Sequence, residues 1–380
     1  MPTLSRRRLL AVAALAAAGL YLPARAEAPS PRLVVVLLRG ALDGLAALPP
    51  LGDPGWPALR RAGGRDESGA LLDGTFALHP GLEPLRPAWD RGELLPIHAV
   101  ATPIRDRSHF LVQDALETGQ GADDRRTDGW LYRGLAAAGR LDEAMAVGRG
   151  APLMLRGEKS VSSVNPGGDD HLDDQRVQAI AALWADDPVL GPAITEALSA
   201  RAMAAGASAK GQDKGAAAVR AALAGAGALL AAEGGPRVLS VELGGWDTHA
   251  DQARRLNVLL GALGDGLAAL PAQVGAAWGQ TAVLVVTEFG RTAAHNGTGG
   301  TDHGTGSAAL LFGGAVRGGR VMADWPGLRP NALFEGRDLQ PTLDVRRLFA
   351  GLLTEHLRLP PSAVAAALPG VAPVEGLARS

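Results

Sequence analysis

The sequence contains no cysteine among its 380 residues. This absence excludes disulfide bonds, thiolate metal sites and cysteine nucleophiles together. Any metal ion that the protein binds must therefore be held by carboxylates, imidazoles or hydroxyl groups.

The sequence also lacks a basic stripe. Its 37 basic and 39 acidic residues leave a formal net charge of −2, so nucleic acid is not an expected partner. We found no repeat of fixed period. A chain of this length with 47% hydrophobic residues can bury a large core, which favours one large domain with an insertion.

The N-terminal segment SRRRLLAVAALAAAGLYLPARAEA has a basic start, an apolar run and a small-x-small cleavage site. The run, Leu9–Leu22, is short for a membrane span, so no stable anchor is expected after processing. Arg6 and Arg7 stand directly before it, as in a twin-arginine signal. We predict that residues 1–26 are such a signal, read by the twin-arginine export machinery. Residues 27–380 would then be a single periplasmic or secreted domain.

Four short apolar runs predict strands of a mostly parallel central sheet. They are RLVVVLLRG (32–40), VLSVELGG (238–245), TAVLVVTEFG (281–290) and SAALLFGGAV (307–316). A segment with helical spacing at 251–278 separates the second and third runs. This alternation predicts an α/β fold with helices on both faces of the sheet. The alanine-rich stretch at about 150–235 predicts a helical insertion, and 341–357 predicts an amphipathic helix capped by Thr342.

Polar residues follow or precede these predicted strands, at the edge where such sheets bind ligands. They are Asp43, Glu242, Asp247, His249, Asp251, Glu288, Asp302 and His303. Each alone has an ordinary explanation: Asp43 can shape a turn, Glu242 can form a surface ion pair, and His249 can be a packed imidazole. Together they predict a site for zinc, manganese, magnesium or calcium.

The stretch RSHF at 107–110 begins another apolar-periodic segment. Ser108 has two open roles there: a nucleophile at a helix N-terminus, where anions are favoured, or a helix cap. His109 could act as a general base or could simply pack. Arg291 could hold a bound anion through two hydrogen bonds or could pair with a neighbouring acid.

Seven ordered blocks carry a resemblance to a known family. They are VVLLRGALDGL, RSHF, ELGGWDTHAD, VVTEFGRT, GTDHGTGS, GGAVRGGRVMADWPGL and RDLQPTLDVR. The chain resembles the exported family called domain of unknown function 1501 (DUF1501), within the alkaline phosphatase and sulfatase superfamily. The resemblance covers nearly all of the mature sequence and implies an alkaline phosphatase-like fold.

The resemblance also implies roles for individual residues. Asp43 matches the acid after the first strand, Ser108 matches the nucleophile, and His303 matches an isolated histidine late in the chain. Two positions depart from the superfamily pattern. Asp251 stands where a histidine is expected, and Phe289 replaces an imidazole.

Superfamily phosphatases usually hold two metal ions, which implies two sites here. The first site would comprise Asp247, His303 and His249, and the second Asp43, Glu288 and Ser108. Because Phe289 removes a ligand from the second site, we expect the first to be better formed and one or two divalent ions to bind.

These inferences lead to two functional hypotheses. The first is a metal-dependent hydrolase of a small anionic ester, a phosphate or a sulfate, with Ser108 as nucleophile and Arg291 assisting. The alternative is a non-catalytic exported binding protein that retains the sulfatase-like fold. Phe289 favours the alternative, whereas the enzyme is favoured by the retained Asp43, Ser108, Asp247 and His303.

Overall fold

The structure is a computed structural model. It describes residues 30–60, 69–121, 126–148, 150–166 and 215–379, with a few positions between 181 and 198. The predicted signal peptide and, within the predicted insertion, most of residues 167–214 lie outside the described residues. Residues Pro31–Ser380 belong to one compact unit.

An eight-stranded sheet forms the centre of this unit, in the order β10-β4-β9-β8-β1-β7-β5-β6. Its strands are β1 (Arg32–Leu38), β4 (Leu94–Ala101), β5 (Ala144–Val147), β6 (Ser163–Val164), β7 (Val238–Leu243), β8 (Thr281–Thr287), β9 (Ser307–Phe312) and β10 (Leu343–Asp344). Strand β9 pairs antiparallel with β4 and β8, and the other pairings are parallel. The prediction of a mostly parallel sheet is confirmed.

Strand β1 shows why the sheet is buried on both faces. Successive side chains of a strand point to opposite faces of the sheet, so alternate residues of β1 enter two different hydrophobic cores. One core receives Val34, Val36 and Leu38, and the other receives Leu33, Val35 and Leu37. The nearly unbroken apolar run in the sequence therefore reflects two buried faces.

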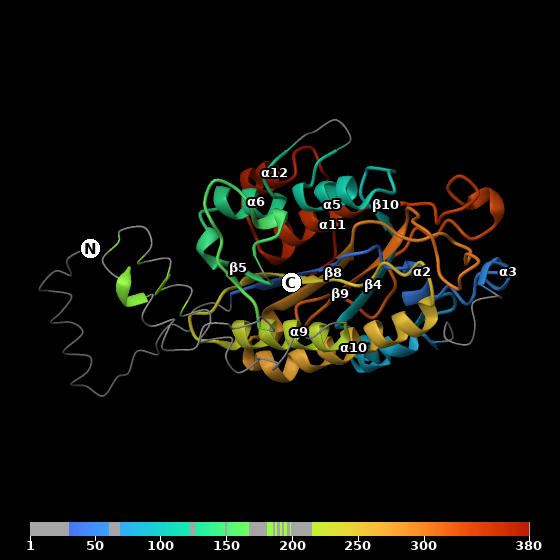
Figure 1. Cartoon of the computed structure of the whole chain (residues 1–380), viewed down its shortest axis with the longest axis horizontal. Helices are drawn as coiled ribbons and strands as arrows, with labels where there is room; N and C mark the ends of the chain where they lie inside the picture. The colour runs from blue at the N-terminus through green and yellow to red at the C-terminus, as the bar shows by residue number, and fades with distance from the viewer. Residues whose placement is uncertain are drawn as a thin grey trace, which may run out of the picture. The chain divides into compact units, whose positions relative to one another are not determined.

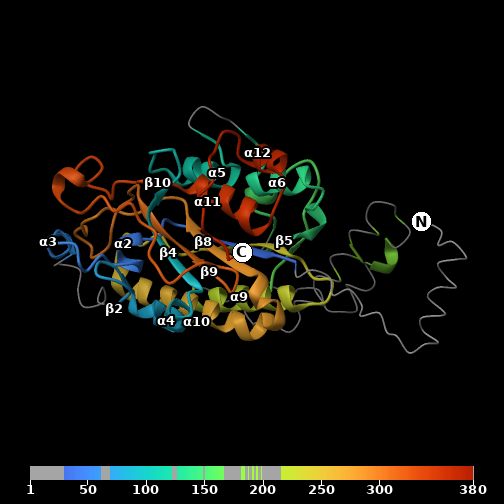
Figure 2. The ribbon, with the colours of Figure 1, turned by 180° about the vertical axis from the view of Figure 1, so that it is seen from behind.

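Helices cover both faces, as predicted (Figures 1 and 2). Helices α9 (Ala216–Ala231) and α10 (Gln252–Val274) lie on one face. The other face carries α5 (His109–Thr118), α6 (Trp130–Ala137), α11 (Val345–Gly351) and α12 (Pro361–Ala367). The stretch Gln252–Gln280 is long and apolar enough to cross a membrane, but α10 packs on α9 and on the turn η2 (Pro80–Leu85).

Five of the smaller elements are short helices and strands. They are α2 (Gly44–Ala47), α3 (Trp56–Arg60), α4 (Arg86–Asp90) and the two-stranded pair β2 (Ala70–Leu71) and β3 (Ala77–Leu78). One predicted cap was wrong. Helix α11 begins at Val345, and the side chain of Asp344, not Thr342, accepts the capping hydrogen bond, from the Arg346 N–H.

Candidate metal centre

The candidate site lies at the carboxyl edge of the sheet. Leu38, at the end of β1, pairs with Leu243 at the end of β7 and with Thr287 at the end of β8, so these three strands end side by side. Because β9 is antiparallel, its first residue lies at this same edge. The loops after β7 and β8 and the loop before β9 therefore meet there, and the N-terminus of α5 joins them.

Three imidazoles meet at this edge through their Nε2 atoms. His303 Nε2 lies 3.1 Å from His109 Nε2 and 3.0 Å from His249 Nε2. The Asp247 carboxylate lies against the same atoms, 3.4 Å from His303 Nε2 and 3.1 Å from His249 Nε2. His109 Nε2 is 3.7 Å from the other Asp247 oxygen. We call these four residues the imidazole cluster.

The opposite nitrogen of each ring, Nδ1, faces a group that can only accept a hydrogen bond. His303 Nδ1 is 2.9 Å from the Arg107 carbonyl, His109 Nδ1 is 2.8 Å from Glu288, and His249 Nδ1 is 3.3 Å from Asp302. These carbonyl and carboxylate partners place the ring proton on Nδ1. In the neutral rings the Nε2 lone pairs then point toward one another, as those of metal-binding histidines do.

The spacing of the cluster fits a single metal ion. Tetrahedral bonds of about 2.0–2.1 Å separate neighbouring ligand atoms by roughly 3.3 Å. The ligand atoms of His109, Asp247 and His303 all lie within 4.8 Å of one another, and His249 adjoins them. Without a metal ion, a second proton on the His109 ring, at Nε2, can form a hydrogen bond to His303 Nε2. A bound ion would displace that second proton. The residues present therefore fit a divalent metal ion.

Glu288 contacts the cluster through His109 Nδ1, and its role as a ligand of a second ion stays a prediction. Its Oε1 accepts hydrogen bonds from Gly40 N–H (2.8 Å), Gln113 Nε2 (2.8 Å) and His109 Nδ1, and its Oε2 accepts one from the Thr287 hydroxyl. Burial raises the pKa of Glu288, but these hydrogen bonds outweigh it and lower the pKa to about 2. Glu288 is thus a permanent carboxylate that orients His109.

Asp43 lies in a different hydrogen-bond network from the imidazole cluster, and its part in a second metal site stays a prediction. Its carboxylate forms a buried ion pair with Arg60 at 2.8 Å and accepts a hydrogen bond from Gln252 Nε2 at 2.7 Å. It also caps α2 through the N–H groups of Leu45 and Ala46. Both carboxylate oxygens are occupied by these partners, so Asp43 has a structural role here.

Arg291 is buried and pairs with a neighbouring acid, which is one of the two roles that the sequence left open. Its guanidinium donates to the carbonyls of Ala41, Gly40 and Thr301 and to the Asp247 carboxylate. Burial raises the pKa of Asp247, but the hydrogen bond from Arg291 overcomes this and lowers it. Arg291 therefore keeps Asp247 ionised and in place.

Ser108 occupies the N-cap position of α5, and its side chain is exposed. Among the described residues, its hydroxyl makes no capping hydrogen bond, and its own N–H donates to Asp106. Ser108 lies between Arg107, whose carbonyl holds His303, and the cluster residue His109. Ser108 is therefore next in sequence to a cluster residue, and its hydroxyl does not cap the helix.

His109 is the cluster residue that the sequence analysis did not place among the ligands. It comes from the first turn of a helix instead of a strand end. The Phe289 ring packs against two of the cluster imidazoles. Its centroid lies 4.9 Å from that of the His109 ring and 5.1 Å from that of the His303 ring. The phenyl ring thus supports two imidazoles at the position where the resemblance had implied a third.

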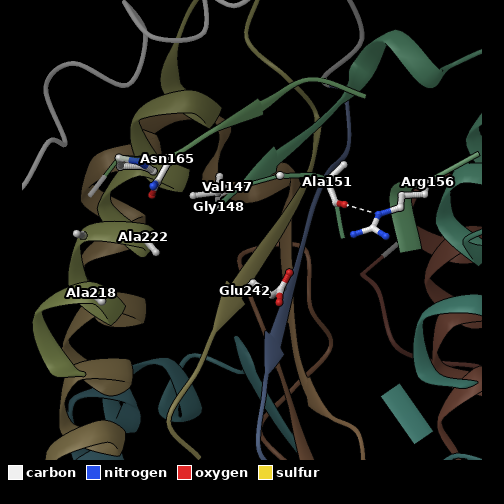
Figure 3. A pocket seen from close by; sticks show the side chains of 11 residues that line it. Val147, Gly148, Ala151, Arg156, Asn165, Ala218, Ala222 and Glu242 are labelled. Atoms are coloured by element: carbon white, nitrogen blue, oxygen red, sulfur yellow. Dashed lines mark hydrogen bonds between the residues drawn. The ribbon is translucent and has the colours of Figure 1, made fainter. Parts of the chain in front are cut away.

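A separate cavity of about 530 Å³ lies beyond the ends of β5 and β6 (Figure 3). Alanines of α9 line one side, and Arg156 and Glu242 are among the other lining residues. Glu242 pairs with Arg39 at 2.9 Å, as expected for an ion pair. The residues that line this cavity do not include any member of the imidazole cluster.

The comparisons with known proteins identify the family. A family model described as "Protein of unknown function (DUF1501)" matches residues 99–368. The chain belongs to the DUF1501 family. None of the curated proteins compared with the chain matches it in sequence.

The solved structures that are similar to this DUF1501 protein include the following two. One is a protein in the alkaline phosphatase superfamily from Vibrio parahaemolyticus, at 11% identity and a TM-score of 0.34 over 78% of this chain and 63% of that one. The chain thus spans less than two thirds of that protein. The other is the soluble domain of lipooligosaccharide phosphoethanolamine transferase A from Neisseria meningitidis, at 10% identity and a TM-score of 0.33 over 75% and 78% of the two chains.

Proposed function

We propose that this DUF1501 protein is an exported metal-dependent hydrolase of phosphate or sulfate esters. The observation that carries the proposal is the convergence of three Nε2 atoms on the Asp247 carboxylate at the carboxyl edge of the sheet. Three neutral imidazoles and one carboxylate around a divalent ion leave a net charge of +1. Such a site attracts an anionic ester and stabilises the charge that develops in its transition state.

The donor set favours one ion of a particular class. Magnesium and calcium take oxygen ligands, whereas imidazole nitrogen suits zinc and the other late first-row metals. A second ion is not expected, because Asp43 is occupied by Arg60 and Glu288 by His109. When bound, the ion would act as a Lewis acid toward the ester and lower the pKa of a nearby hydroxyl group.

Ser108 is the nucleophile in this proposal. Its Oγ forms a bond to phosphorus or sulfur while the ester bond breaks, the serine proton passes to solvent, and the alcohol takes a proton from water. Water then hydrolyses the seryl ester, which restores Ser108 and releases phosphate or sulfate. The first-turn N–H groups of α5 have no intrahelical partner and point toward this position, where they favour an anion.

Ser108→Ala tests the nucleophile directly. We expect turnover of an aryl phosphate or aryl sulfate to fall by more than about 1,000-fold, since the attacking atom is removed. The free energy of unfolding should change by less than about 0.5 kcal/mol, because the hydroxyl makes no capping bond among the described residues. Enzyme assays and urea unfolding measure the two effects.

Ser362→Ala, an exposed serine on α12, is the matched control and should leave turnover unchanged. Ser108→Asp should fold and also lack turnover, because its charge repels the anionic ester. Retained hydrolysis in Ser108→Ala would reject the covalent step. Absence of wild-type turnover over a broad ester panel, with metal present, would favour the non-catalytic binding protein.

Export by the twin-arginine machinery belongs to the same proposal and has its own test. Replacement of Arg6 and Arg7 by lysine should leave an unprocessed precursor in the cytoplasm, because the arginine pair is the recognised feature. Cell fractionation with detection of the precursor measures this. Arg25→Lys, outside the pair, should export normally. Normal periplasmic accumulation of the double variant would end the twin-arginine interpretation.

A further inference from the structure

The exposed ring of Phe110 has no role in the cluster, although it follows His109 directly. Its side chain is 85% exposed, the largest fraction among the exposed large hydrophobic residues of the described chain. Single apolar residues are common on surfaces, but this aromatic ring is one residue from a candidate metal ligand.

Phe110 lies in the same first turn of α5 as His109. One side of the helix faces inward: His109 reaches the cluster, Val112 is buried, and Gln113 donates to Glu288 at 2.8 Å. Phe110 lies about 100° further around the helix, beside this inward side. Helical side chains lean toward the N-terminus, so Phe110 leans toward the turn that contains Ser108, with most of its ring in solvent.

The first turn of α5 therefore offers two different surfaces next to each other. The N–H groups that follow Ser108, together with the metal ion expected at the cluster, suit the charged part of an ester. Phe110 offers an apolar, aromatic surface for the group attached to it. A ligand that matches both surfaces has an anionic head and an aromatic body.

We propose that Phe110 binds the aromatic leaving group of the substrate, so that aryl esters of phosphoric or sulfuric acid are the preferred class. This inference rests on the proposed hydrolase function. The ring contacts the leaving group in the ground state and in the transition state alike. Its loss therefore raises KM and changes kcat little.

Binding of two phosphonates, which are not hydrolysed, tests the inference without turnover. Phenylphosphonate and methylphosphonate share the anionic head and differ in the aromatic body. Calorimetry on the full-length mature protein should give a wild-type preference for phenylphosphonate of about 10-fold or more, and Phe110→Ser should abolish it. Val258→Ser, which replaces an apolar residue that is 49% exposed on α10, is the matched control and should keep the preference.

The turnover of phenyl phosphate and methyl phosphate completes the experiment. Each KM is compared between two proteins on one substrate, so the intrinsic reactivity of the esters cancels. We expect Phe110→Ser to raise KM for phenyl phosphate about 10-fold or more while its metal content stays at the wild-type value.

An equal loss for both ligands, or no wild-type preference for the phenyl ligand, would overturn the inference and leave the hydrolase proposal standing. A phenyl preference that depends on Phe110, in a protein that hydrolyses neither ester, would instead support the aryl site and reject the hydrolase.

Discussion

The His303→Ala protein is expected to lose its bound metal ion. The wild type, purified without chelator, should hold about one divalent ion per chain. His303 contributes the Nε2 atom that lies within 3.4 Å of each of the atoms it contacts in His109, His249 and Asp247. Its removal should weaken metal affinity by more than about 100-fold. Loss of a residue that only hydrogen-bonds to a ligand usually costs about 10- to 100-fold, and loss of the ligand itself should cost more. Elemental analysis and competition with a chromophoric chelator measure the change.

Two further variants provide an intermediate effect and a control for this loss of metal affinity. Glu288→Gln keeps the shape of a residue that orients His109 and should cost about 10- to 100-fold in affinity. His356→Gln removes an imidazole that contacts the Arg32 carbonyl, at the far end of β1, and should bind metal like the wild type. If His303→Ala and Asp247→Asn both retained wild-type affinity, the imidazole cluster would not be the metal site.

The central strands could be predicted because their sequences carry a pattern. Strands β1, β7, β8 and β9 are apolar runs, and burial on both faces of a sheet produces such runs. Strand β4 was not predicted, since Pro96 and His98 interrupt its apolar character. Strands β6 and β10 have two residues each, too few for any periodicity. Their pairing depends on the rest of the sheet and not on local sequence.

The location of the candidate site could be predicted from the sequence, but the role of each residue in it could not. Strand ends predicted Asp247, His249 and His303, and the structure brings these three together. Glu288 lies one residue beyond β8, where burial and three donors turn it toward His109 instead of the Nε2 atoms. No local pattern distinguishes a ligand from a residue that orients one.

Asp43 illustrates the same limit over a longer distance. Its position after β1 is that of a possible ligand, and only the fold shows that Arg60 and Gln252 reach it from other elements. His109 shows the reverse: it starts a helix, where serine and histidine are ordinary residues, and the packing of α5 on the sheet edge brings it to the cluster. Contacts between distant segments decided both cases.

Asp43→Ala is expected to lower the free energy of unfolding by about 3–5 kcal/mol and to leave metal binding unchanged. The side chains of Asp43 and Arg60 are each 1% exposed, so removal of the carboxylate deletes a fully buried ion pair. The cap of α2 is lost as well. Asp265→Ala removes the partner of Arg220 in an ion pair that is half exposed, and this control should cost less than about 1 kcal/mol. Urea unfolding measures stability, and elemental analysis measures metal. Loss of metal with unchanged stability would return Asp43 to the metal ligands.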